Sequence, residues 1–436
     1  MDPMTTGLLG LGLMFALIAI HVPIGVAMGM AGLIGCGLII GWEPALSLLS
    51  TEPSSALGSL ALAVIPLFLL MGNFAHAGGL STELYKVAGA FFGHRRGGLA
   101  ISTVLGCAGF GAVCGSSVAT AATMSRIALP EMTAHRYGEG FAAATIATGG
   151  TLGIIIPPSV VLVLYGVLTE NSITALFVAS VIPGLLTVVF YMVAVSIYAR
   201  IAPDQAPVGP KTSWPERWKT VRECWAIVLL AVAVGAGIYS GVFTVTEAAS
   251  VGATFAFFIA LARGRMSMAR FVESIRDTVT STSLIFVIII GASVFSYFVT
   301  LSGMPQAVVA GIDSLGVAPL LVIVLLQIVY LIAGAIFDEI AAMVITLPFV
   351  YPLITGMGYD PLWWGVVNVI LISMGMIIPP IGINVFVVQS MATHIPLTRI
   401  YRGITPFVFA DVGRLAVITL FPALCTWLPK ATGWAN

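Results

Sequence analysis

Long apolar runs follow one another along almost the whole of this sequence. A membrane-spanning helix needs about 20 predominantly apolar residues. Nine runs are about that long or longer: 7–41, 59–77, 139–169, 174–199, 223–241, 243–262, 281–301, 361–393 and 403–428. None of them alternates with period two, as the strands of a transmembrane barrel would. The sequence therefore predicts an all-α polytopic membrane protein.

Charged residues are too few to cover the surface of a soluble protein of this length. They make up 8 % of the 436 residues, whereas soluble domains carry roughly 25 %. This scarcity excludes a soluble enzyme, a disordered chain and a nucleic-acid-binding protein. Lys plus Arg and Asp plus Glu number 18 each, so net charge favours neither an acidic nor a basic partner. The five cysteines form no CxxC pair, which argues against a disulfide framework or a zinc site.

Lysine and arginine residues predict the orientation of the spans, because they favour the cytoplasmic side. Residues 97–132 are apolar, with basic residues at both ends. Residues 316–356 are also apolar, but no Lys or Arg occurs anywhere between 276 and 399. Each segment must therefore return to the side that it left. This pattern predicts two re-entrant helical hairpins, which a membrane protein tolerates only where their tips are buried in protein or face water.

The second half of the chain repeats the first. The motif Gly153–Pro158 (GIIIPP) returns as Gly375–Pro380 (GMIIPP), and the basic residues give the two halves opposite orientations. Inverted-topology repeats with broken helices are typical of secondary transporters. The predicted organisation begins with an N-terminal scaffold helix and an outer loop (1–58), followed by a first repeat (59–200) with a hairpin (97–132) and a broken helix (139–169). Residues 201–280 then form a cytoplasmic loop, scaffold helices and an amphipathic arm at 264–280. The inverted second repeat (281–436) has its own hairpin (316–356) and broken helix (361–393).

Each double proline predicts a break in its helix and a set of free carbonyl oxygens. Proline lacks an N–H and clashes with the preceding turn, and carbonyls at helix C-terminal ends suit a hard cation such as Na⁺. The facing hairpin tip would complete each cage. The predicted metal ligands are Cys114, Ser116, Gly153, Ile156 and Pro157 at the first site, and Gly334, Asp338, Gly375, Ile378 and Pro379 at the second. The alternatives are proline kinks that serve packing alone and, for the aspartate, a proton relay or a position at the watery mouth of the hairpin.

Hydroxyl and amide side chains beside the breaks are candidates for binding an anionic substrate, because helix N-termini are electropositive. These candidates are Ser117, Thr120, Thr151 and Asn384. Interhelical hydrogen bonding explains such residues in membrane helices equally well. Arg126 could attract a substrate carboxylate, and the alternative is that its side chain snorkels to the cytoplasmic surface.

Several motifs resemble the large membrane subunit of tripartite ATP-independent periplasmic (TRAP) transporters. They are 149–159 (GGTLGIIIPPS), 164–166 (LYG), 182–184 (IPG), Gly334-x-x-x-Asp338 and 376–384 (MIIPPIGIN). The resemblance implies an elevator-type fold, two sodium sites on the residues named above, and sodium-driven uptake of an organic acid such as a C4-dicarboxylate or a sialic-acid-like carboxylate. It also implies a periplasmic substrate-binding protein, a small four-helix membrane subunit and a multi-pass location in the bacterial inner membrane. In that family the first tip often reads Ser-Gly-Ser, and here it is Cys114-Gly115-Ser116.

Two other functions compete with this expectation. A stand-alone divalent-anion/sodium symporter shares the hairpins and inverted repeats but works without a binding protein. An intramembrane enzyme would need a catalytic dyad or a metal triad, and none of the five histidines has a nucleophile or a second ligand at useful spacing. We therefore expect a transporter subunit in the lipid bilayer, and no enzyme.

Overall fold

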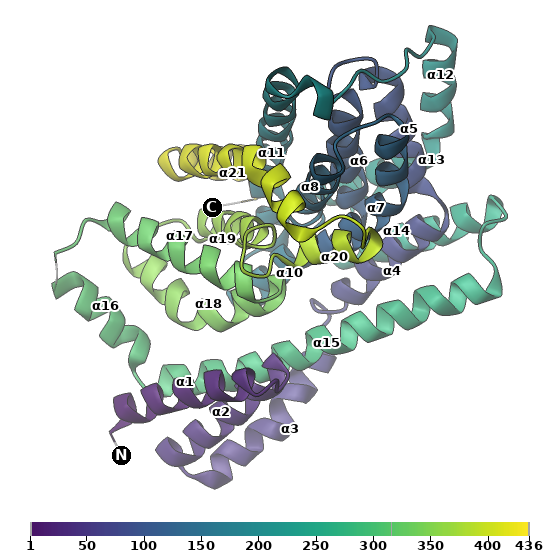
Figure 1. Ribbon diagram of the computed structural model, residues 1–436. Coiled ribbons are helices and arrows are strands. Elements are labelled where there is room, and N and C mark those ends of the chain that lie inside the picture. Colours follow the sequence, from purple (N-terminus) through teal and green to yellow (C-terminus); the bar gives the residue numbers. More distant parts are fainter. Residues whose placement is uncertain (1, 315, 435–436) are drawn as a thin grey trace.

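The computed structural model describes residues 2–314 and 316–434, and within these ranges the chain folds into 22 α-helices and one short 3-10 helix, without a β-strand (Figure 1). Six of the helices are long and apolar enough to cross a membrane, and three bent helix pairs raise that number to as many as nine. The predicted all-α polytopic fold is confirmed.

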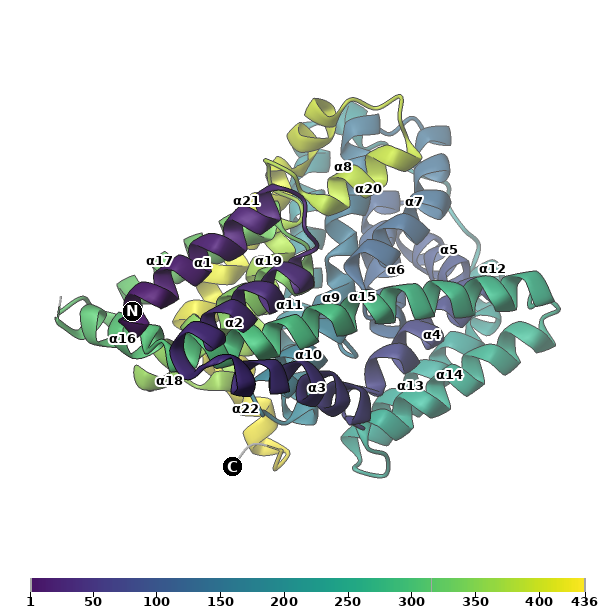
Figure 2. The same cartoon turned by 90° about the horizontal axis from the view of Figure 1, so that it is seen from below.

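The longest helix, α15 (Met268–Leu301), is the axis of a helical scaffold. Its 34 residues extend about 50 Å at 1.5 Å per residue. Helix α2 (Ile24–Ile40) packs along it, and α1 (Pro3–Ala19) and α3 (Trp42–Gly58) pack on α2 (Figure 2). Glycines allow this close approach, because a Cβ on Gly25 would lie 2.5 Å from the Val287 carbonyl oxygen. Small residues that bring two backbones together are typical of membrane helix pairs.

Two parts of the scaffold differ from the sequence expectation. The first apolar run forms two helices, because the chain turns at His21 with φ +68°, and the expected outer loop within 1–58 contains α3. The expected separate arm at 264–280 is wrong, since residues from Met268 onward are the first turns of α15. No proline interrupts this helix, so the polar arm and the apolar span are continuous.

The first repeat begins where α4 (Val64–Ala77) bends by 65° into the arm α5 (Leu80–Phe92). Next comes the first hairpin, and then a helix that is broken before its last two turns. The helices are α6 (Gly98–Cys114) and α7 (Ser117–Ala134) in the hairpin, α8 (Glu139–Gly150), α9 (Leu152–Ile155) and α10 (Val160–Leu168) in the broken helix, and α11 (Ile173–Ile201). Three helices then link the repeats: α12 (Trp214–Glu223), α13 (Trp225–Tyr239) and α14 (Val245–Ala262).

The second repeat has the same order of elements. Its arm, α16 (Met304–Ser314), follows a left-handed glycine, Gly303, just as α5 follows Gly79. Its other helices are α17 (Pro319–Ile336) and α18 (Glu339–Gly356) in the hairpin, α19 (Pro361–Gly375) and α20 (Ile383–Met391) in the broken helix, and α21 (Leu397–Leu420), with α22 (Ala423–Ala431) closing the chain. The chain therefore contains two hairpins and two broken helices, as predicted.

The two hairpins approach each other along α15 from opposite ends. Both tips share one cavity, and residues 281–288 of α15 also line it. The outgoing arm of the first hairpin, α7, shares a second cavity with residues 270–277 of α15. The outgoing arm of the second hairpin, α18, shares a third cavity with residues 289–300. This order along a single helix is the arrangement that inverted repeats require.

Candidate functional site

The first hairpin tip lies directly against the first helix break. Helix α6 ends at Cys114, and the chain turns at Gly115, whose φ of +67° favours glycine. Ser116 then caps α7 by accepting a hydrogen bond from the Ala119 N–H at 3.4 Å. Beyond the double proline, the Val160 N–H donates to the Gly115 carbonyl at 3.4 Å. The tip and the break are therefore fixed to each other by the backbone.

The first break leaves several carbonyl oxygens without a donor. In the described ranges, no N–H or O–H donates to the carbonyls of Gly153, Ile156 and Pro157. The Ser116 carbonyl oxygen lies close to this group, 2.5 Å from the point where a Cβ on Gly153 would stand. It already accepts from the Thr120 hydroxyl at 2.7 Å and from the Thr120 N–H at 3.2 Å. The Cys114 sulfur lies beside Gly72 of α4, 3.2 Å from the point where a Cβ would stand. The thiol thus packs against α4, while the Thr120 hydroxyl lies beside the break, 2.7 Å from the Cβ position of Gly153.

The second hairpin tip meets the second break in the same way. Asp338 caps α18, where its Oδ1 accepts from the Ile340 and Ala341 N–H groups at 3.0 Å each. The N–H groups of Ile381 and Gly382, just beyond the double proline, donate to the Ala335 carbonyl at 3.2 and 3.4 Å. Nothing in the described part of the chain donates to Oδ2 of the aspartate.

The carbonyls of the second break are only partly free. In residues 2–314 and 316–434, those of Gly334, Ile378 and Pro379 have no donor. The Gly375 carbonyl differs, since it accepts from the Ile378 N–H at 3.1 Å. The proline removes the helical donor for this carbonyl, and a tighter turn supplies the Ile378 N–H in its place. The two predicted sites are therefore similar but not identical.

Pairs of glycines bring each hairpin against its broken helix. A Cβ on Gly111 of α6 would lie 2.6 Å from the Gly153 Cα, and a Cβ on Gly375 would lie 2.6 Å from the Gly334 Cα. These two contacts occupy equivalent places in the two repeats. The sequence analysis identified three of the four glycines as carbonyl ligands but missed Gly111. The spacing could have revealed it, because Gly111 lies three residues before Cys114 at the first tip and Gly334 lies three residues before Phe337 at the second.

Most of the predicted substrate-binding side chains form hydrogen bonds within the protein. Asn384 of α20 donates to the Ser117 hydroxyl at 2.6 Å and to the Ala147 carbonyl at 3.1 Å, and thereby joins the second broken helix to the first repeat. Asn384 and Ser117 are both fully buried. The Asn384 Oδ1 atom has no partner among the described residues. The structure thus brings Ser117 and Asn384 together where the two repeats meet.

A buried ion pair is connected to the first break through Tyr191 and Thr151. The Arg414 Nη2 and Asp411 Oδ1 atoms are 2.8 Å apart, and both side chains are at most 1 % exposed. The guanidinium lies over the Tyr191 ring, 5.6 Å from its centroid, and the tyrosine hydroxyl is 3.2 Å from the Thr151 hydroxyl. Thr151 donates in turn to the Thr148 carbonyl at 2.7 Å. Interhelical bonding therefore accounts for this threonine, and Tyr191 is a member of the network that sequence reasoning missed.

Three cavities line up beside the scaffold helix α15. The central cavity, between the hairpin tips, has a volume of about 380 Å³, and its polar lining consists of Ser116, Ser281, Asp338 and Glu339. Arg126 is exposed and lines a different cavity of about 700 Å³, next to Arg265 and Arg270. Of the predicted site residues only Cys114 lines this cavity with Arg126, so Arg126 lies apart from the other substrate-binding candidates.

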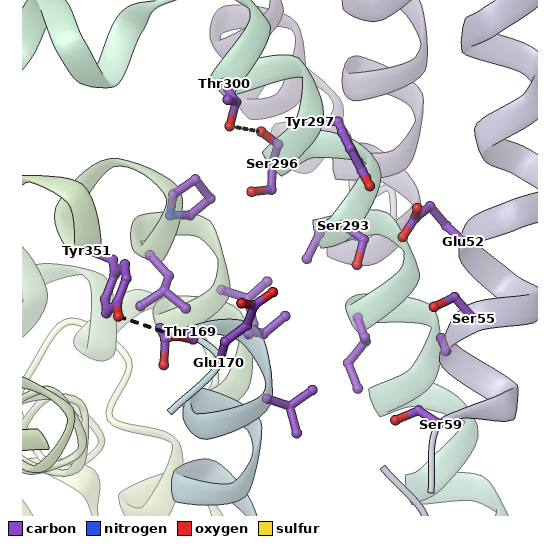
Figure 3. Close-up of a pocket in the computed structure, with 18 of the residues that line it drawn as sticks. Glu52, Ser55, Ser59, Thr169, Glu170, Ser293, Ser296, Tyr297, Thr300 and Tyr351 are labelled. Atoms are coloured by element: carbon purple, nitrogen blue, oxygen red, sulfur yellow. Dashed lines mark hydrogen bonds between the residues drawn. The ribbon is translucent and has the colours of Figure 1, made fainter. Parts of the chain in front are cut away.

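The third cavity, of about 560 Å³, lies between the scaffold and the second hairpin (Figure 3). Glu52 and Ser55 of α3 and Ser293 of α15 form one wall, and Glu170 and Tyr351 lie opposite. Its lining, like that of the central cavity, contains no Lys, Arg or His among the described residues.

Residues 11–424 match the family described as "Tripartite ATP-independent periplasmic transporter, DctM component". The chain belongs to this TRAP transporter family. It is 37 % identical to the C4-dicarboxylate TRAP transporter large permease protein DctM of Pseudomonas aeruginosa, over 85 % of this chain and 87 % of that protein. It is 28 % identical to the sialic acid TRAP transporter large permease protein SiaM of Vibrio cholerae, over 96 % of each. The resemblance noted from the sequence motifs is confirmed.

A solved structure shares the fold of this TRAP permease. The crystal structure of the Alcanivorax borkumensis YdaH transporter superposes with a TM-score of 0.62, covering 87 % of this chain and 89 % of that one at 14 % identity. The family and the apolar helices together make the chain a multi-pass TRAP large permease subunit. The helix breaks and hairpin tips described above are therefore features of a transporter.

Proposed function

We propose that this permease takes up an organic acid across the bacterial inner membrane by sodium symport. The observation that carries the proposal is that a hairpin tip lies against a proline break in each repeat, where the break leaves carbonyl oxygens without donors. Unpaired carbonyls at membrane depth are costly unless a ligand or water satisfies them. Oxygen-only cages suit hard cations, and the donor set offered here fits Na⁺.

Each repeat would hold one sodium ion. Gly153, Ile156 and Pro157 supply carbonyl oxygens at the first site, and the hairpin adds the Ser116 carbonyl, which would contact the ion while Thr120 also donates to it. At the second site Asp338 adds a carboxylate oxygen to the free carbonyls of Gly334 and Ile378. Ion binding at either site would join a hairpin to a broken helix, and the two moving parts would then travel together.

The organic acid would bind between the two tips. The central cavity of about 380 Å³ has the size of a small-ligand site. The N–H groups of Ser117 and Val118 in the first turn of α7 have no acceptor among the described residues. A helix N-terminus with open N–H groups attracts a carboxylate. Relatives named for C4-dicarboxylate and sialic acid transport fit a carboxylate substrate.

Transport would follow an elevator mechanism along α15. The hairpins and broken helices would carry the ions and the acid past the scaffold, which stays fixed in the bilayer. The cavities on either side of the tips, beside residues 270–277 and 289–300, provide the spaces into which the moving part could shift. Similar repeats of opposite orientation can exchange their conformations, which alternates access between the two sides.

Two partners follow from membership of a tripartite family: a periplasmic substrate-binding protein that delivers the acid, and a small four-helix membrane subunit. To test this, the cognate binding protein is first screened with a panel of organic acids. Uptake of the radiolabelled acid that it binds is then measured in proteoliposomes that hold the permease alone, with the small subunit, or with both partners. We expect at least about a tenfold higher rate with both partners present. Equal uptake by the permease alone would identify a stand-alone symporter instead.

A further inference from the structure

The junction between α12 and α13 marks a membrane–water interface. Helix α13 begins at Trp225 and is apolar to Tyr239, and no charged residue lies between Glu223 and Glu247. Helix α12, which precedes it, is polar and bends away by 50°. Four basic and two acidic residues lie in the segment 211–223. A span that begins with an exposed tryptophan after a basic segment is typical of the headgroup region.

One face of α12 is fixed to the first arm, α5, beside which it lies in Figure 1. The Phe91 and Trp214 rings meet edge to face with centroids 6.4 Å apart. The Arg217 guanidinium lies 5.6 Å from the Phe91 centroid and 5.2 Å from the Trp214 centroid. These contacts hold the helix in one orientation, so the position of its opposite face is defined.

That opposite face is an open groove of about 770 Å³ lined by Pro215, Trp218, Lys219, Arg222, Glu223 and Trp225. Trp218 of α12 and Trp225, the first residue of α13, are about 60 % exposed. Lys219 and Arg222 lie between them on the same side and are also exposed. With Glu223 the groove has a net charge of +1, and Lys219, Arg222 and Glu223 have no salt-bridge partner among the described residues.

We propose that this groove binds the headgroup of an anionic phospholipid. A phosphodiester carries one negative charge, which matches the net charge of the groove, and Arg and Lys are the usual donors to phosphate oxygens. Tryptophans prefer the headgroup level, where one edge of the ring meets apolar chains and the other meets water. The groove lies at the first turn of a span, so a lipid whose headgroup occupied it would have its acyl chains beside α13. The bound lipid would anchor the scaffold next to the arm α5.

Native mass spectrometry of the purified permease with its small subunit tests the proposal. The complex is titrated with phosphatidylglycerol and, separately, with phosphatidylcholine. We expect phosphatidylglycerol to bind at least about five times more tightly, and the preference to vanish in the double variant Lys219→Gln/Arg222→Gln. The matched control, Arg200→Gln/Lys211→Gln, removes two exposed positive charges outside the groove, and we expect it to keep the preference.

A second readout locates the lipid. Brominated phosphatidylglycerol should quench tryptophan fluorescence more than the brominated phosphatidylcholine does, and Trp218→Phe/Trp225→Phe should remove most of the difference. Equal binding of both lipids, or equal loss in the groove and control variants, would overturn the proposal. Quenching that appears only when the small subunit is absent would show that the groove is a protein interface, and would overturn it as well.

Discussion

An Asp338→Asn variant is expected to require at least about ten times more sodium than the wild type for half-maximal uptake. Asparagine caps helices as well as aspartate does, so the two hydrogen bonds from Ile340 and Ala341 that start α18 should survive. What disappears is the negative charge on Oδ2. A tenfold change corresponds to about 1.4 kcal/mol, which lies within the range expected when a charged ligand is lost from a partly buried site.

The measurement is the initial uptake rate as a function of sodium concentration in proteoliposomes with both partners present. Asp360→Asn is the matched control, because Asp360 caps α19 in the same manner, with its Oδ1 2.9 Å from the Leu362 N–H. We expect the control to keep the sodium dependence of the wild type. If the Asp338 variant also keeps it, the second ion site lies elsewhere.

A Gly375→Val variant is expected to lose at least about 95 % of the uptake rate while still inserting in the membrane. A Cβ at this position would lie 2.6 Å from the Gly334 Cα and 2.7 Å from the Ala335 nitrogen. Backbone cannot move aside as a side chain can, so the second hairpin must shift from the broken helix. Overpacking of this kind costs about 1–3 kcal/mol, which a membrane protein can survive, but the predicted cage of oxygens would open.

Gly12→Val is the control for this variant, since a Cβ on Gly12 of α1 meets no atom within 4 Å. Both variants are compared for elution as a single species and for stabilisation against heat by added sodium. We expect the Gly375 variant alone to lose the stabilisation that sodium gives. Full uptake by the Gly375 variant would show that the close contact between hairpin and break is unnecessary for transport.

The sequence predicted those parts of the fold that depend on local chemistry. Double prolines interrupt a helix wherever they stand, and both predicted breaks are present, at Ile156–Ser159 and between α19 and α20. The hairpins followed from the placement of arginines. In contrast, residues 42–58, which carry no Lys or Arg, were expected to form an outer loop, and they form the helix α3. Packing against α2 and α15 stabilises a helix there instead.

Details of the candidate site depend on contacts between residues far apart in the chain. Tyr191 lies 40 residues from Thr151, and nothing in the spacing of the sequence links them. At the second break the Gly375 carbonyl accepts a hydrogen bond from the Ile378 N–H, and this new partner depends on how the chain turns after the helix ends. The assignment of the predicted residues to two sodium sites stays a prediction. The structure names the carbonyl oxygens that could bind the ions, because these oxygens have no donor among the described residues.

Replacement of sodium by other cations shows whether the two helix breaks hold the coupling ions. Uptake is measured in proteoliposomes with both partners present, under an inward gradient of Na⁺, of K⁺ or of choline at equal ionic strength. Cation sites formed by the two breaks and hairpin tips predict rapid accumulation with Na⁺ and at least about a tenfold lower rate with either replacement. Equal rates in all three salts would show that sodium does not drive uptake.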